Sequence, residues 1–134
     1  MGLAYLHDIM VMLIFSHGPT LTRYRDAKMA FLAAGDVEFL PYWTNGDVFS
    51  TGTDAVKVSA YRRPGACLLM AMNLNKEPTA AVITVNLKAL GLEGGGVRAT
   101  DAVTGDAIPF TSGALALRLQ GRWLHMIKLE AERR

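Results

Sequence analysis

The sequence predicts a mainly β protein: an antiparallel β-sandwich with one or two N-terminal helices packed on it. Residues 67–75, CLLMAMNLN, carry no charge and place apolar side chains on both alternating sets, which is typical of a strand covered on both faces. From residue 55 onward, short strand-like segments are separated by Gly, Pro or Asn turn signals, as in sandwiches. The segment 20–34, by contrast, is rich in helix-forming residues.

Length and composition narrow the classes of protein. The 134 residues fit one domain, or a small domain with a fragment of another, and are enough for one sizeable core. A hydrophobic content of 51% excludes a disordered tail. The net charge is +2 and the basic residues are scattered, so we expect no nucleic-acid partner. The apolar run 1–15 is interrupted by His7 and Asp8 and is shorter than the roughly 20 residues that span a bilayer, so we expect no membrane partner. No signal-peptide pattern is evident, and the sequence assigns no compartment.

Residues 1–36 are predicted to form a helical lead-in. The continuous apolar run over 3–16 fits either a buried helix or a short strand over 3–6 that leads into a helical turn, and periodicity does not decide between them. Residues 20–34 carry apolar side chains at helical spacing, and Gly35 is placed to end the helix.

The sandwich is predicted to span residues 37–130, followed by a frayed, charged tail over 131–134. Pro41 and Pro109 each interrupt an extended segment, which predicts edge strands at these two places because proline cannot donate to a ladder. The predicted strands cover residues 37–43, 55–62, 67–75, 79–87, 97–103, 107–110, 114–119 and 122–129.

Alternation assigns the side chains of two strands to faces. In residues 55–62 the apolar even-numbered side chains are predicted to point inward, and Lys57, Ser59 and Tyr61 outward. In residues 67–75 the two sets are predicted to be covered on opposite faces. One set is Cys67, Leu69 and Ala71, and the other is Leu68, Met70, Met72 and Leu74.

No catalytic group, metal site or cofactor is predicted. The EGGG segment at 93–96 lacks the spacing and the lysine of a phosphate-binding loop. The histidines His7, His17 and His125 and a single cysteine are too few and too widely spaced for a zinc site. Cys67 is predicted to be a small buried hydrophobe, and His125 a surface or satisfied core histidine.

Two groups of residues are candidates for carbohydrate binding. His7 and Asp8 would stand at the C-terminal end of a short strand, where α/β barrels carry active-site groups. They fit equally the end of an element that they cap, and no second carboxylate for glycoside hydrolysis is evident. Tyr42, Trp43 and Asn45, with Asp47, form an aromatic–amide group beside a tight turn. The group fits a sugar ring, or alternatively the packed junction between helices and sandwich.

The sandwich segments resemble a known architecture. Residues 68–92, 99–110, 113–119 and 122–130 resemble the C-terminal β-sandwich that follows the catalytic barrel in glycoside hydrolases of the α-amylase and α-galactosidase groups. The features that carry the resemblance are a strand ending in Asn, a polar loop, a β-branched strand and the D-x-x-T-G turn at 101–105.

The lead-in resembles the end of a barrel. Residues 4–10, the helix over 20–34 and the segment 37–48 look like the last barrel strand, helix and junction of a glycoside-hydrolase-like family. The resemblance implies that residues 1–36 are a remnant of a barrel whose other parts are missing, since a barrel takes about 250 residues.

The resemblance has implications for function. It implies a glycoside hydrolase as parent and, for this chain, a fragment or non-catalytic accessory domain that supports the barrel. The chain itself is then not an enzyme, because the paired carboxylates belong to the barrel. The alternatives are an independent carbohydrate-binding module, a small enzyme using His7 and Asp8, and a truncated product without a function. The candidate partners are a carbohydrate and a second copy of the chain, bound through the N-terminal apolar segment.

Overall fold

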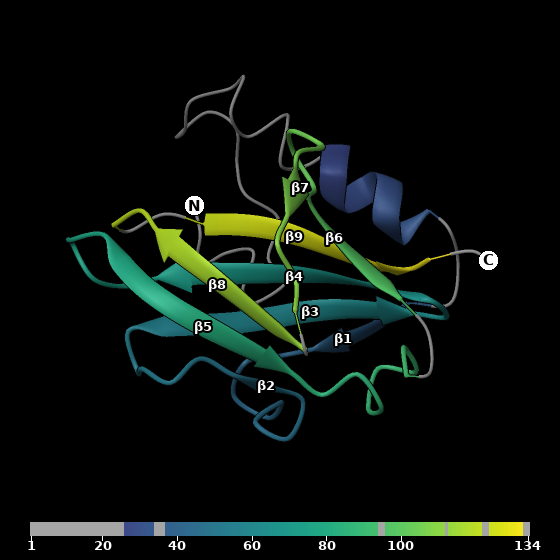
Figure 1. The fold of residues 1–134 in the computed structure, drawn as a ribbon, viewed down its shortest axis with the longest axis horizontal. Coiled ribbons are helices and arrows are strands. Elements are labelled where there is room, and N and C mark those ends of the chain that lie inside the picture. The colour runs from purple at the N-terminus through teal and green to yellow at the C-terminus, as the bar shows by residue number, and fades with distance from the viewer. Residues whose placement is uncertain (1–25, 34–36, 94–95, 112, 122–123, 133–134) are drawn as a thin grey trace.

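The computed structural model describes residues 26–33, 37–93, 96–111, 113–121 and 124–132 (Figure 1). The lead-in before residue 26, with His7, Asp8 and the alternatives for 3–16, lies outside them. The strands of the described part are β1 (Glu38–Leu40), β2 (Phe49–Ser50), β3 (Val56–Arg63), β4 (Ala66–Asn73), β5 (Thr79–Val85), β6 (Val97–Asp101), β7 (Ala107–Ile108), β8 (Ala114–Leu119) and β9 (Leu124–Ala131).

The strands form two antiparallel sheets. The six-stranded sheet has the order β1-β3-β4-β9-β6-β7, and the three-stranded sheet has the order β2-β5-β8. Figure 1 shows β5 and β8 crossing in front of β3 and β4, as the second layer of a sandwich. One short helix, residues 26–32, is described within the predicted helix over 20–34. The prediction of a mainly β, antiparallel β-sandwich is confirmed.

The central strand β4 is buried along its whole length, and all 8 of its residues are classed as buried. It pairs with β3 on one side and β9 on the other. Its side chains alternate as predicted, with Leu69 in the core between the sheets and Leu68 in a second cluster on the opposite face. The assignment of Leu74 is wrong, because it lies beyond the strand and is 39% exposed.

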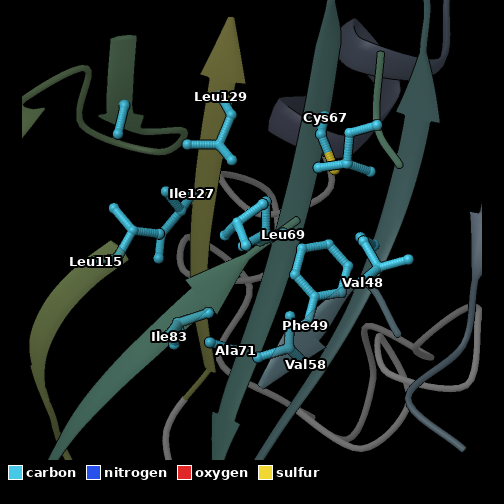
Figure 2. Packing of buried hydrophobic residues seen from close by; sticks show 14 of the residues in the cluster. Val48, Phe49, Val58, Cys67, Leu69, Ala71, Ile83, Leu115, Ile127 and Leu129 are labelled. Atoms are coloured by element: carbon cyan, nitrogen blue, oxygen red, sulfur yellow. The ribbon is translucent and has the colours of Figure 1, made fainter. Parts of the chain in front are cut away.

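The core between the sheets joins apolar side chains from both layers (Figure 2). Leu69 and Ile127 come from the six-stranded sheet, and Phe49, Ile83 and Leu115 from the three-stranded sheet. Burying a Leu, Ile or Phe side chain stabilises a fold by roughly 1.5–3 kcal/mol. This face is the main source of stability of the sandwich.

The opposite face of the six-stranded sheet carries a second apolar cluster, here called the outer cluster. Its buried members are Phe31, Tyr61, Ala66, Leu68, Met70, Met72, Leu124 and Met126. Phe31 belongs to the helix over 26–32, so this helix packs on the sheet. Ser59 and Tyr61 do point away from the core between the sheets, as predicted, but both are buried rather than exposed, because β3 lies in a sheet that is covered on both faces.

Pro41 follows β1 and Pro109 follows β7, and these strands are the two edges of the six-stranded sheet, as the prolines predicted. β9 continues to Ala131, beyond its predicted end. The sequence did not predict β2, because a two-residue strand is too short to show a period. Among the described residues, no helix is long and apolar enough to cross a membrane.

Candidate functional site

The aromatic surface, defined as Phe39, Tyr42 and Trp43, lies on β1 and the turn that follows it. Phe39 is paired in register with Tyr61 of β3, and their rings lie 5.1 Å apart between centroids. Trp43 meets Phe39 edge-on at 6.4 Å and Tyr42 edge-on at 5.2 Å. Tyr61 is 3% exposed and Trp43 is 55% exposed, so the group rises from the outer cluster to solvent.

Two buried polar side chains hold the turn that carries Trp43. Ser59 accepts a hydrogen bond from the backbone N–H of Tyr42 at 3.0 Å. Asn45 donates from Nδ2 to the carbonyl oxygens of Leu40 at 3.1 Å and Val58 at 2.8 Å. Because these bonds join the turn to β1 and β3, they fix the direction in which the indole is presented.

Asn45 therefore does not lie on the surface, as we expected of a residue that binds a sugar. Its side chain is buried, and the amide nitrogen is used by two backbone carbonyls. Tyr42 and Trp43 are brought together by the fold as expected, whereas the predicted partners His7 and Asp8 lie outside the described residues.

The base of the aromatic surface includes a cation. Lys28 lies with its Nζ 5.3 Å from the centroid of the Tyr61 ring and is itself buried. A cation at this distance over an aromatic face contributes roughly 0.5–2 kcal/mol, more when it is desolvated. The helix over 26–32 is thus tied to the underside of the ring group, which adds to its rigidity.

Cys67 has the environment expected of a buried hydrophobe. Burial raises the pKa of its thiol to about 12, and the positive charge of Arg62 offsets this only in part. A thiol with this pKa is protonated at neutral pH and is a poor nucleophile. Within the described part of the chain, no group of three or more His, Cys, Asp or Glu side chains is placed to hold a metal ion.

His125 on β9 departs from both expectations for it. It is half-buried, and its Nε2 is buried without a hydrogen-bond partner among the described residues. Burial lowers the pKa of the imidazole below its ordinary value of 6.5, and the nearby Asp101 carboxylate opposes the shift only in part. The fold therefore favours the neutral form.

We expect this histidine to make the fold less stable in acid. The folded pKa is depressed, so the unfolded chain binds the proton more readily, and stability falls as pH drops below 6.5 towards the folded pKa. Urea denaturation between pH 8 and pH 5 should show a steeper loss for the natural chain than for His125→Phe. Equal slopes for the two proteins would contradict the assignment.

The structure contains a cleft beside β1, away from the aromatic surface, that the sequence did not predict. It is lined by Glu38, Arg62 and Arg63 together with the turn over residues 88–91. Its members are far apart along the chain. The pairing of Glu38 with Arg62 in the sheet and the hydrogen bond from Arg62 to Ala89 bring them together. The adjacent arginines were the one available signal, and alone they fit any solvated surface.

We compared the chain with protein-family models, curated protein sequences and solved structures. No protein-family model matches the chain, and no curated protein sequence matches it either. A similar solved structure is a variant of a GH27 β-L-arabinopyranosidase from Geobacillus stearothermophilus, in complex with arabinose. The TM-score is 0.49 at 18% identity, and the match covers 60% of this chain and 18% of that chain. A likeness of this size carries no argument about activity or substrate.

Proposed function

We propose that this chain is a non-catalytic β-sandwich accessory domain of a glycoside-hydrolase-like protein, and that it supports a catalytic barrel. The sequence resemblance described above suggests the class of parent protein. The observation that carries the supporting role is the outer cluster, the second apolar face of the six-stranded sheet.

The outer cluster has the character of a packing layer between structural units. Leu68, Met70, Leu124 and Met126 are buried there on the side of the sheet opposite the sandwich core. A lone sandwich needs only one apolar face per sheet, with polar side chains outside. A sheet that is apolar on both faces needs a further layer, and in the described residues the helix over 26–32 contributes to it through Phe31.

The chemistry of the outer cluster suits such a layer. Three of its eight buried members are methionines, Met70, Met72 and Met126. Methionine is unbranched and adapts to irregular partner surfaces. A face of this composition is fitted to pack against helices that belong to the N-terminal side, as in a domain that closes one flank of a barrel.

A second candidate function is carbohydrate binding at the aromatic surface. The specific observation in its favour is the 55% exposure of Trp43 on a rigid base formed by Phe39 and Tyr42. An exposed indole offers a flat apolar face to the C–H groups of a sugar ring. Few polar groups accompany it, because the nitrogen of Asn45 is used internally.

One set of assays separates these functions. The purified chain is incubated with a panel of aryl glycosides and titrated with oligosaccharides by calorimetry. A supporting domain should show neither turnover nor saturable binding. A binding module should bind saturably, lose at least about tenfold in affinity in Trp43→Ala, and be unaffected by Val82→Ala, which alters an apolar residue of matching exposure, 54%, on the three-stranded sheet. Turnover that Asp8→Ala abolishes would contradict both.

A further inference from the structure

We propose that the cleft beside β1 is a binding site for a small molecule that carries an oxyanion group. The cleft measures about 440 Å³, within the roughly 300–1,000 Å³ of small-molecule sites. Its rim carries two cationic side chains, Arg62 and Lys88, against one carboxylate, Glu38. This inference does not depend on the proposed function, since it concerns a different surface.

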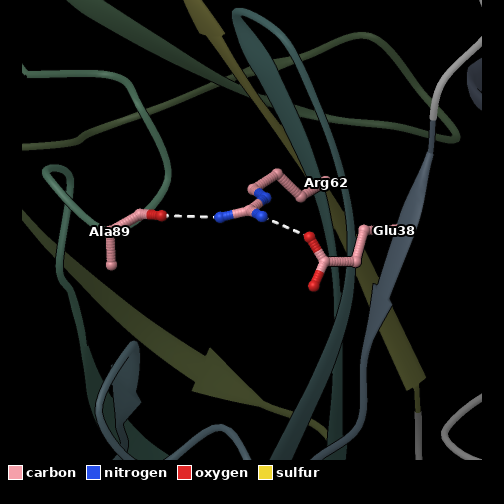
Figure 3. A network of polar contacts seen from close by, with 3 residues as sticks. All are labelled: Glu38, Arg62 and Ala89. Atoms are coloured by element: carbon pink, nitrogen blue, oxygen red, sulfur yellow. Dashed lines mark hydrogen bonds and ion pairs between the residues drawn. The ribbon is translucent and has the colours of Figure 1, made fainter.

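Arg62 is held in place at both ends of its guanidinium (Figure 3). Its Nη1 donates to the backbone oxygen of Ala89 at 2.8 Å, and its Nη2 donates to a carboxylate oxygen of Glu38. A guanidinium has five N–H groups, so about three remain for a ligand. The group is thus oriented before binding, and a planar fork of this kind matches carboxylate, sulfate and phosphate oxygens.

The turn that supplies Ala89 also positions Lys88. The backbone N–H of Leu90 bonds to the oxygen of Leu87 at 3.2 Å, and that of Gly91 to the oxygen of Lys88 at 3.1 Å. Gly91 has a φ of 71°, a left-handed conformation that favours glycine. Lys88 is exposed, and within the described part of the chain no ion pair satisfies its ammonium.

Arg63 lines the edge of the cleft, but its guanidinium points to the opposite face of the sheet. Its guanidinium lies 4.1 Å from the centroid of the Phe31 ring, and its Nη1 donates to the backbone oxygen of Phe31 at 2.7 Å. It is thereby held against the helix over 26–32 rather than by a carboxylate. Since Arg62 and Lys88 face a single carboxylate, Glu38, the cleft keeps a net positive charge that attracts an anion.

The test is calorimetric titration of the full chain with sodium sulfate, sodium phosphate and sodium glucuronate at constant ionic strength. We expect saturable binding of at least one probe. Binding of glucuronate alone would assign the site to a carboxylate-bearing sugar, and binding of sulfate or phosphate to a tetrahedral oxyanion. If no probe binds saturably at up to about 10 mM, the proposal is overturned.

Two variants should change the affinity in opposite directions. Lys88→Ala removes an ammonium and should weaken binding about tenfold. Glu38→Gln removes the competing negative charge but keeps an oxygen that can accept from Arg62, and should tighten binding about threefold.

The matched controls are Lys76→Ala and Glu77→Gln, which make the same charge changes at exposed positions in the loop after β4. We expect them to leave the affinity unchanged. Equal effects in the controls would show that net charge alone governs binding, and would overturn the site. Thermal unfolding of each variant checks that the fold is retained.

Discussion

Leu69→Ala and Leu68→Ala are each expected to lower the free energy of unfolding by about 3 kcal/mol. The two leucines are neighbours in β4 and both are fully buried, but Leu69 faces the sandwich core and Leu68 faces the outer cluster. Truncating a buried leucine removes transfer free energy and leaves a cavity, at a total cost of roughly 2–5 kcal/mol. The residues opposite Leu69 are Ala60 and Ile127, and the small alanine does little to fill such a cavity.

This pair tests whether the six-stranded sheet has two true cores. Urea denaturation followed by circular dichroism gives the free energies, with Val82→Ala as the control because this valine is 54% exposed. If Leu68→Ala costs less than about 1 kcal/mol while Leu69→Ala costs the full amount, the outer cluster is only a loosely packed surface. The supporting role proposed for that face would then lose its basis.

The sequence predicted the part of the fold that depends on local pattern. The run CLLMAMNLN has no polar side chain until Asn73, and a strand of this kind has to be covered on both faces, as β4 is. The turn signals predicted where the other strands end, and the two prolines predicted the edge strands. Both are local restrictions on the backbone, so they can be recognised in the sequence.

The errors arose where burial depends on a neighbouring layer. The alternation in β3 was interpreted as one face in water and one in the core, yet Ser59 and Tyr61 are both buried on the outer face, where Tyr61 belongs to the outer cluster. Ser59 is tolerated there because its hydroxyl accepts from the Tyr42 N–H. The sequence of a single strand does not determine whether its polar side chains will face water or a buried hydrogen-bond partner.

The candidate sites show the same limit. Tyr42 and Trp43 were found because they are adjacent in the chain, and aromatic pairs are visible in any sequence. The cleft joins Glu38, Arg62 and Lys88 across large separations, through the β1–β3 pairing and the contact of Arg62 with Ala89. Such a site depends on tertiary contacts, which no local pattern records.

The second large effect is expected at Asn73, where the end of β4 is joined to the end of β8. Its buried side chain donates from Nδ2 towards the backbone oxygens of Glu77 at 3.1 Å, Leu119 at 3.2 Å and Gln120 at 3.3 Å. Its Oδ1 accepts from the N–H of Asn75 at 3.0 Å. One amide thus links the loop after β4 to the three-stranded sheet.

The loop and the sheet meet closely at this point. A Cβ added to Gly121 would lie 1.9 Å from the backbone oxygen of Lys76, so the two backbones leave no room for a side chain. In such a junction water has little access to replace a lost hydrogen bond, and a buried polar group without a partner costs roughly 1–3 kcal/mol.

We therefore expect Asn73→Ala to lower the free energy of unfolding by about 3 kcal/mol, because it removes the hydrogen bonds from Nδ2 to three backbone oxygens and the acceptor of the Asn75 N–H. Asn75→Ala is the matched control, because its exposed side chain donates a hydrogen bond from Nδ2 to Thr79 Oγ1 at 3.3 Å. The loss of this exposed bond should cost less than about 0.5 kcal/mol. Urea denaturation measures both. Similar small losses in the two variants would mean that the loop is held by its backbone contacts alone, and that the two sheets are joined at this end without the amide of Asn73.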